Sequence, residues 1–264
     1  CTPDAMFPVT LKEKGIITFA VEFLLDENSV IHSVDIGRST NVKPSTGTYY
    51  IEKGNEGVMN FLDNVGTQVE ELEQYYKIDI STKNGDAIPC AVNQLEKLVR
   101  NENSTKKSLS ILSSFFLDET GEKLGIASPD EDEEVVMKAT KLQTESNLLV
   151  LTLDIRYPTG MVEVKMKNRL TRAVTNLGLK GSVISSKPPI DFDEEHPMIK
   201  RLIHVYESVT GRHDPPASIS GGTYARVYPD RVIAFGALLP GEPITAHQKN
   251  EYVKLELMRL WLEI

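Results

Sequence analysis

The sequence lacks the features that mark secreted, disulfide-rich or membrane-spanning proteins. Its two cysteines, Cys1 and Cys90, provide neither a disulfide framework nor a CxxC metal pattern. So few cysteines fit a reducing, intracellular setting. No apolar run approaches the roughly 18 residues that a membrane span needs, and no signal peptide is visible. We therefore expect a cytoplasmic protein without a membrane partner.

Clusters of basic residues are absent as well. The chain has 29 Lys and Arg against 38 Asp and Glu, a formal net charge of −9, and no long basic run. Nucleic acids and anionic membrane surfaces are bound by clustered positive charge, so both are excluded as partners. The remaining composition, 40% hydrophobic and 25% charged, is that of a folded domain, and 264 residues suffice for one large domain or two small ones.

The common catalytic motifs are missing too. HExxH, GxSxG, Walker A and GxGxxG do not occur, so no complete catalytic site can be assembled by motif. His247 lies in a loop bounded by Pro and Gly, where a zinc ligand is possible, but one histidine is not a site. Asp4, in an irregular segment, could bind a metal or simply cap a turn. The other four histidines are interpreted as structural or surface residues.

A Gly-Gly pair offers a possible anion site. Gly221, Gly222 and Thr223 follow a short predicted strand, and Arg226 comes one helical turn after Gly222. A carboxylate could therefore meet backbone N–H groups and a guanidinium together. A plain tight turn is the alternative interpretation.

Hydrophobic periodicity predicts two regions that differ in character, with a Pro-rich boundary near residue 188. Strands are predicted at 15–25, 31–36, 48–51, 77–81, 147–157, 181–185, 217–219 and 232–235. Helices are predicted at 58–76, 91–100, 109–116, 160–177, 194–209 and 251–264.

Several linked motifs resemble one known family, the M20 metallopeptidases, and within it the dipeptidase V (carnosinase-like) branch. ESVTG (207–211), GGTYAR (221–226), VIAFG (232–236), PG (240–241) and AHQKNE (246–251) occur here in the order of that branch. Further similarities extend over most of the chain: TPDA with FP (2–8), Asn-Val (41–42), TGEKLG (120–125) and RYP (156–158).

The resemblance implies an α+β lid domain, an antiparallel sheet flanked by helices, inserted into an α/β zinc-peptidase catalytic domain. Residues 1–8 would end an N-terminal catalytic segment, residues 9–187 would form the lid, and residues 188–264 would form the C-terminal part of the catalytic domain. Only that C-terminal portion of the catalytic domain would be present, and it would expose apolar faces.

The same resemblance implies dipeptide hydrolysis at two zinc ions, with Mn or Co as possible replacements. Asp4 and His247 would be metal ligands. Asn41 and Arg156 would be catalytic residues that reach the substrate or oxyanion from the lid. Gly221, Gly222 and Thr223 would bind the carboxylate of the substrate, while Arg226 is assigned no direct contact. A monomer is compatible with a large lid.

Two departures from the family pattern limit this expectation. The HxD ligand pair, the bridging Asp and the Glu-Glu pair are absent, and they would belong before Cys1. Because the chain does not start with Met and its last helical pattern has no Gly or Pro stop, we expect a truncated chain that is inactive alone and lacks its N-terminal catalytic segment. The family's lid also has a His in HxSxP, and Gly85 falls at that position. This favours an alternative, a catalytically impaired M20-fold binding or regulatory protein.

Overall fold

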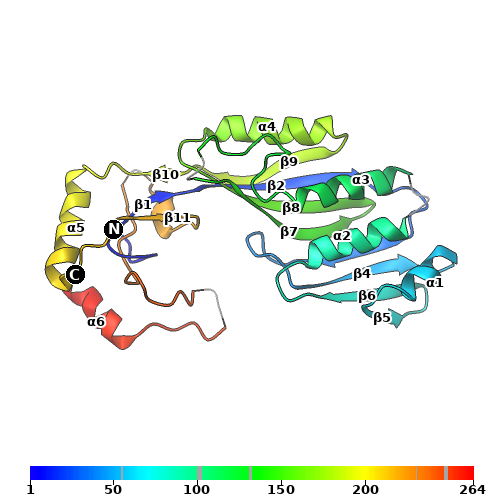
Figure 1. Cartoon of the computed structure of the whole chain (residues 1–264), viewed down its shortest axis with the longest axis horizontal. Helices are drawn as coiled ribbons and strands as arrows, with labels where there is room; N and C mark the ends of the chain where they lie inside the picture. The colour runs from blue at the N-terminus through cyan, green and yellow to red at the C-terminus, as the bar shows by residue number, and fades with distance from the viewer. Residues whose placement is uncertain (55, 100–102, 131–132, 230, 247–248) are drawn as a thin grey trace. The chain divides into compact units, whose positions relative to one another are not determined.

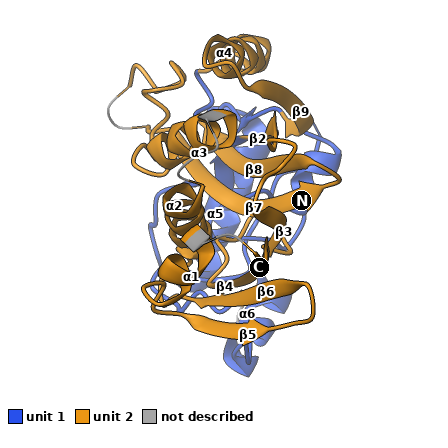
Figure 2. Ribbon diagram, turned by 90° about the vertical axis from the view of Figure 1, so that its right-hand side faces the viewer, with its two compact units in different colours: residues 1–15, 158–160, 188–264 blue, residues 16–157, 161–187 orange. Residues whose placement is uncertain are grey.

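The chain folds into two compact units. The computed structural model describes residues 1–264 except 55, 100–102, 131–132, 230 and 247–248 (Figure 1). Unit 1 consists of residues 1–15, 158–160 and 188–264, and unit 2 of residues 16–157 and 161–187 (Figure 2). Residues 9–15, which the sequence assigned to the lid, therefore belong to unit 1 in the structure. Whether the units correspond to a catalytic part and a lid stays a prediction.

Unit 2 is built on one large sheet. Eight strands lie in the order β5-β6-β4-β3-β7-β8-β2-β9. The pairs β3–β4, β3–β7, β4–β6, β5–β6, β7–β8 and β2–β9 are antiparallel, as predicted. The strands are β2 (Gly15–Leu24), β3 (Ile31–Ile36), β4 (Thr46–Glu52), β5 (Gln68–Glu71), β6 (Tyr75–Ser81), β7 (Val136–Glu145), β8 (Leu148–Tyr157) and β9 (Lys180–Lys187).

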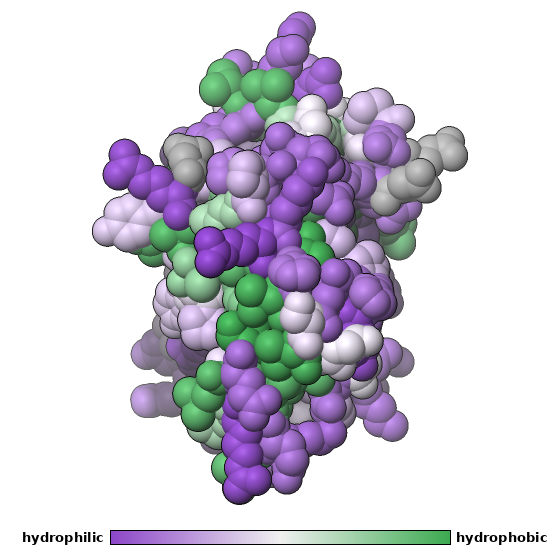
Figure 3. Space-filling view, turned by 90° about the vertical axis from the view of Figure 1, so that its left-hand side faces the viewer, coloured by the Kyte–Doolittle hydropathy of each residue, from purple (hydrophilic) through white to green (hydrophobic). Residues whose placement is uncertain are grey.

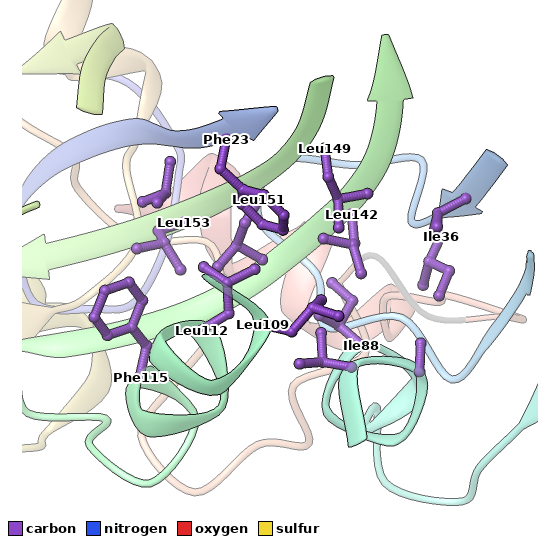
Figure 4. Close-up of a cluster of buried hydrophobic side chains, with 14 of the residues drawn as sticks. Phe23, Ile36, Ile88, Leu109, Leu112, Phe115, Leu142, Leu149, Leu151 and Leu153 are labelled. Carbon is purple, nitrogen blue, oxygen red and sulfur yellow. The ribbon is translucent and has the colours of Figure 1, made fainter. Parts of the chain in front are cut away.

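Helices pack on this sheet and form the larger core. Alternation along β8 points Leu149, Leu151 and Leu153 toward α3, where they meet Leu109 and Leu112 (Figure 4). Each of these leucines is at most 1% exposed, and burying one contributes about 1.5–3 kcal/mol. The α+β class with a helix-flanked antiparallel sheet is thus confirmed. The helices of unit 2 are α1 (Glu56–Leu62), α2 (Ala87–Leu98), α3 (Asn103–Phe115) and α4 (Glu163–Asn176).

The predicted helix 58–76 is wrong over most of its length. Helix α1 ends at Leu62, and the chain then turns through Gly66, which has a φ of 68°. Beyond it, Val69 pairs with Ile78 in β5–β6. Strand β5 is a sheet edge of sequence QVEE, and its charged residues mask the strand pattern. Strand β7 was not predicted at all, because Lys138 and Lys141 interrupt its apolar pattern.

Unit 1 holds a small mixed sheet. Strand β1 (Thr10–Glu13) lies between β10 (Ile190–Asp191), to which it is antiparallel, and β11 (Ala217–Ile219), to which it is parallel. Its other elements are α5 (Pro197–Thr210), the 3-10 helix η1 (Tyr224–Val227) and α6 (Leu255–Glu263). The ring of Phe7 stacks on Tyr206 at 5.5 Å and meets Phe235 edge-on at 5.3 Å. These three aromatic side chains lie together in the hydrophobic core of unit 1.

Helix α5 has clear boundaries in the sequence. The side chain of His196 accepts a hydrogen bond from the Met198 N–H at the helix start, and Pro197 follows it at the first helical position. Gly211 ends the helix with a φ of 67°. His196 is therefore an exposed helix cap.

The segment 232–235 is a correction to the predicted strand. It forms only isolated bridges, from Ala234 to Thr2 and to Thr10. The Phe235 N–H donates to the Thr2 carbonyl at 2.9 Å, and the Thr10 N–H donates to the Ala234 carbonyl at 2.9 Å. The segment therefore connects residues 2–10 to the core of unit 1 without forming a ladder.

Helix α6 carries apolar side chains on two faces. Leu257 is buried and Trp261 packs on the core, where its Nε1–H donates to the Ala237 carbonyl at 2.8 Å. Leu255 and Leu262 are 69% and 89% exposed. Figure 3, which faces the side of unit 1 where α5 and α6 are drawn in Figure 1, shows hydrophobic residues gathered there. None of the described helices is both long enough and apolar enough to cross a bilayer.

Candidate functional site

The predicted site residues are divided between the two units. Asp4 and residues 221–223 belong to unit 1, whereas Asn41 and Arg156 belong to unit 2. His247 lies outside the described residues. Each group is therefore described within its own unit.

The loop 220–224 of unit 1 follows β11 and leads into η1. Gly221 and Gly222 are exposed, and a Cβ added to Gly221 would meet nothing within 4 Å. Thr223 is buried and caps η1, its hydroxyl accepting a hydrogen bond from the Ala225 N–H at 3.2 Å. The loop thus has an open glycine side and an anchored threonine side.

A buried carboxylate, that of Glu13, anchors this loop. Glu13 ends β1 and is 1% exposed. It accepts hydrogen bonds from the Thr223 N–H at 3.1 Å, the Thr223 hydroxyl at 2.5 Å and Nε of Arg226 at 2.5 Å. The sequence suggested that a ligand carboxylate could meet backbone donors and a guanidinium here, whereas in the structure Thr223 and Arg226 bind an internal carboxylate. The carboxylate is the chain's own Glu13, which sequence reasoning missed.

Arg226 uses every nitrogen of its guanidinium. Beyond the ion pair with Glu13, Nη1 donates to the Pro188 carbonyl at 2.7 Å and Nη2 to the Lys14 carbonyl at 2.5 Å. Its side chain is 8% exposed. Removing one partner of such a buried ion pair typically costs about 3–5 kcal/mol, because the other charge is left unpaired. Arg226 is therefore held by groups of the chain itself.

Asp4 is attached to the same loop. Its Oδ2 accepts a hydrogen bond from the Tyr224 N–H at 2.8 Å, and its side chain is half-buried. The next residue, Ala5, has a φ of 70°, which costs a non-glycine residue about 1–2 kcal/mol. Bridges from Thr2 and Met6 to 234 and 238 hold this strained turn in place. Such local strain is typical of functional segments.

The described residues of each unit do not complete a metal site. Among the residues that the structure describes, no group of three or more His, Cys, Asp or Glu side chains could hold a metal ion. Catalytic zinc typically requires three protein ligands. Asp4 alone does not fit a zinc ion, and no chemical step can be derived through a metal from these residues.

In unit 2, Asn41 lies in the exposed loop between β3 and β4, where its Oδ1 accepts a hydrogen bond from the Ser39 hydroxyl. Two backbone hydrogen bonds join this loop to residues 82–87. The Thr82 N–H donates to the Ser45 carbonyl at 2.7 Å, and the Ala87 N–H donates to the Pro44 carbonyl at 3.0 Å. The Asn-Val turn and the Gly85 region are therefore neighbours, although 44 positions separate Asn41 from Gly85.

Gly85 has a conformation that disfavours any side chain. Its φ is 76°, and an added Cβ would lie 2.8 Å from Cβ of Lys43. A histidine at this position would require the loop to move. The only histidine of unit 2 is His32, which stacks on Tyr75 at 3.9 Å near the start of β3, while Asn41 follows the end of that strand. Among described residues, unit 2 thus places no histidine in the Asn41 loop.

Arg156 lies on β8 next to a buried acid. Its Nε is 2.9 Å from Oδ2 of Asp154, whose side chain is 5% exposed. Residues two apart share one strand face, so both side chains lie opposite the helix-covered leucines. The ion pair restrains the guanidinium on that face.

A second network in unit 1 was also missed by sequence reasoning. Nε and Nη2 of Arg212 donate to Asp214 at 2.6 and 3.0 Å, and Nη2 also donates to the Pro240 carbonyl at 3.1 Å. The hydroxyl of the buried Tyr206 donates to Asp214. Hydrogen bonds from Arg212 and Tyr206 lower the pKa of Asp214 below its usual value. The network also holds the backbone at Pro240.

Comparison with known proteins finds relatives that are named as peptidases. No protein-family model matches the chain. Over 277 residues it is 30% identical to the "Putative dipeptidase YtjP" of Bacillus subtilis (strain 168), covering 96% of this chain and 59% of the relative. The chain therefore spans less than two thirds of that relative's length.

Solved structures show a weaker likeness. An aminoacylhistidine dipeptidase from Vibrio alginolyticus has a TM-score of 0.46 and 10% identity over 90% of this chain and 58% of its own. The M20 family metallo-carboxypeptidase Sso-CP2 from Sulfolobus solfataricus has a TM-score of 0.43 and 14% identity over 97% of this chain and 57% of its own.

Proposed function

We propose that this chain is a dipeptidase-like member of the M20 peptidases and supplies part of a di-zinc dipeptidase. The 30% identity to a dipeptidase by name, over 96% of the chain, supports the family. The ordered motifs from ESVTG to AHQKNE support the same assignment. The substrate class is a dipeptide, and zinc is the proposed metal, with Mn or Co as alternatives.

In this proposal Asp4 and His247 are metal ligands, one from the segment that precedes unit 2 in the sequence and one from the segment that follows it. Gly221, Gly222 and Thr223 line the site of the substrate carboxylate, which the backbone N–H groups of the exposed Gly221 and Gly222 bind, while Thr223 is held on Glu13. Asn41 and Arg156 reach the substrate from unit 2, which acts as the lid. The Asp154 carboxylate positions Arg156, and the Ser39 hydroxyl positions Asn41.

One observation carries the proposal, the hydrogen bond between Asp4 Oδ2 and the Tyr224 N–H. It joins the proposed metal ligand to the loop proposed for the substrate carboxylate, across 220 positions of sequence. A dipeptidase needs these two functions side by side, because only a short substrate separates the scissile bond from the carboxylate. The strained turn at Ala5 supports the same interpretation.

The test uses a longer protein that contains this chain, assayed with alanyl-alanine in the presence of Zn²⁺, Mn²⁺ or Co²⁺. We expect turnover, and we expect Asp4→Ala and His247→Ala each to reduce it more than about 100-fold, since even outer-shell partners of metal ligands cost 10–100-fold. His204→Ala is the control, because His204 is exposed on α5 and outside the proposed site. Full activity of Asp4→Ala would overturn the assignment.

A second candidate function is a catalytically impaired binding or regulatory protein of the same fold. The conformation of Gly85 and the absence of a histidine in the Asn41 loop among described residues favour it. The same assay separates the two candidates. Binding of alanyl-alanine without hydrolysis under any of the three metals would favour the impaired protein, and steady turnover would reject it.

A further inference from the structure

The polypeptide passes between the two units near residues 15 and 188. Unit 1 ends its first segment at Gly15 and resumes at Pro188, apart from the short stretch 158–160. We name the segments 14–16 and 187–189 the crossings. Any change in orientation between the units must involve the backbone at these crossings, because hinge motions concentrate at a few positions between elements.

One side chain, that of Arg226, binds both crossings from within unit 1. Its Nη2 donates to the carbonyl of Lys14 at 2.5 Å, and its Nη1 donates to the carbonyl of Pro188 at 2.7 Å. These residues are far apart in sequence, yet the planar guanidinium spans them. Lysine could not replace this arrangement, because its single ammonium lacks the fixed fork of donors.

The third guanidinium nitrogen connects the crossings to the loop 220–224. Nε donates to Glu13, and the same carboxylate accepts from the N–H and hydroxyl of Thr223. Glu13 and Arg226 are 1% and 8% exposed at their side chains. Water therefore hardly screens this pair, and its geometry is more tightly constrained than that of a surface ion pair.

We propose that the Glu13–Arg226 pair is a positioning device that couples the loop 220–224 to the two crossings. A ligand that displaces Thr223 must pull on Glu13, and through Arg226 on the carbonyls of Lys14 and Pro188. Conversely, a reorientation at the crossings is transmitted to the loop. The coupling rests on contacts inside unit 1. Only its catalytic meaning rests on the proposed function.

The test compares Arg226→Lys with Arg212→Lys in the 264-residue chain, by amide hydrogen exchange at Lys14, Thr223 and Tyr224. Arg212 is the matched control, since it too binds a carboxylate and a backbone carbonyl in unit 1, but no crossing. We expect Arg226→Lys to speed exchange at Lys14 and Thr223 together, by about 10- to 100-fold, from the loss of charged hydrogen bonds. Arg212→Lys should leave both amides protected.

A distance measurement separates coupling from a local structural role. Spin labels are attached through Asn28→Cys in unit 2 and Arg201→Cys in unit 1, both exposed positions, after Cys1 and Cys90 are replaced by serine. At a temperature where circular dichroism shows a folded protein, Arg226→Lys should broaden the distance distribution and Arg212→Lys should not. Faster exchange at Thr223 alone, or an unchanged distribution, would overturn the coupling.

Glu13→Gln provides a second variant in case Arg226→Lys does not fold. It keeps the size and an acceptor oxygen but removes the charge, and the same two effects are expected. Neither measurement uses a substrate. Failure of the dipeptidase assay would therefore leave this inference standing, and failure here would leave the dipeptidase proposal standing.

Discussion

Gly236 lies directly against the ring of Phe7: a Cβ added to Gly236 would be 2.2 Å from the ring carbons. Its φ of 69° also disfavours a side chain. Since Phe7 is held between Tyr206 and Phe235, it cannot move aside. We expect Gly236→Ala to lower the free energy of unfolding by about 2–5 kcal/mol, from overpacking plus backbone strain.

Gly178→Ala is the matched control for this prediction, measured by urea unfolding alongside the first variant. Gly178 has a similar φ of 81°, but nothing lies within 4 Å of its added Cβ. Only backbone strain remains, so we expect a loss of about 1–2 kcal/mol. Equal losses for the two variants would show that the contact with Phe7 has no influence.

Thr10 has a buried hydroxyl without a hydrogen-bond partner among the described residues, and it is 1% exposed. Thr10→Val removes this unsatisfied group. We therefore expect the free energy of unfolding, measured by thermal denaturation, to rise by about 1–3 kcal/mol. Thr140→Val is the comparison, because the equally buried Thr140 hydroxyl donates to the Thr152 carbonyl at 3.2 Å. That variant should lose stability. A loss in both would contradict the assignment of Thr10.

Asp118 predicts an acid-sensitive contribution to stability in unit 2. Burial raises the pKa of this carboxyl, but hydrogen bonds from the backbone N–H groups of Lys123, Glu122 and Gly121 and from the Thr120 hydroxyl outweigh burial and hold the pKa below its usual value. The folded-state pKa is thus below the unfolded value. The carboxylate therefore stabilises the fold above the unfolded pKa and loses this contribution as pH falls through the folded one.

We expect Asp118→Asn to be about 1–3 kcal/mol less stable than the natural chain at pH 7, from lost charged hydrogen bonds. The difference should stay constant down to about pH 5 and shrink below about pH 4, where the natural carboxylate itself gains a proton. Chemical unfolding at a series of pH values measures both curves. A stability difference between the two proteins that grows toward low pH would contradict this prediction.

The isolated 264-residue chain should bind zinc weakly or not at all. Asp4 and His247 are two proposed ligands, whereas catalytic zinc typically has three from the protein. Calorimetric titration with Zn²⁺ should show no tight stoichiometric binding, and Asp4→Ala should give the same trace as the natural chain. Tight binding that Asp4→Ala abolishes would mean that this chain alone contains a complete site.

The sequence predicted the elements in which the pattern of apolar residues matches the residues that are buried. Strands β2, β3 and β8 are rich in β-branched and apolar residues, and α5 has a helical stripe with a glycine stop, so local signals and tertiary packing agree. It failed at the edge strand β5, where Val65, Val69 and Leu72 imitate helical spacing and only the pairing with β6 makes a strand.

The candidate site was predictable only in part. The glycine loop and Asp4 stand out as local motifs. Glu13 does not, because the sequence TLKEKG looks like an ordinary solvated strand end. What makes Glu13 important is Thr223, 210 positions later in the chain, and no local pattern records such a contact.

Histidine is unevenly distributed between the two units. Four of the five histidines fall in residues 188–264, and unit 2 has only His32. Histidine is the side chain that ordinarily changes charge between pH 5 and 8. The only cysteine of unit 2, Cys90, has a pKa raised by burial and stays a neutral thiol there. The imidazole groups of the protein are therefore concentrated in the segments of unit 1.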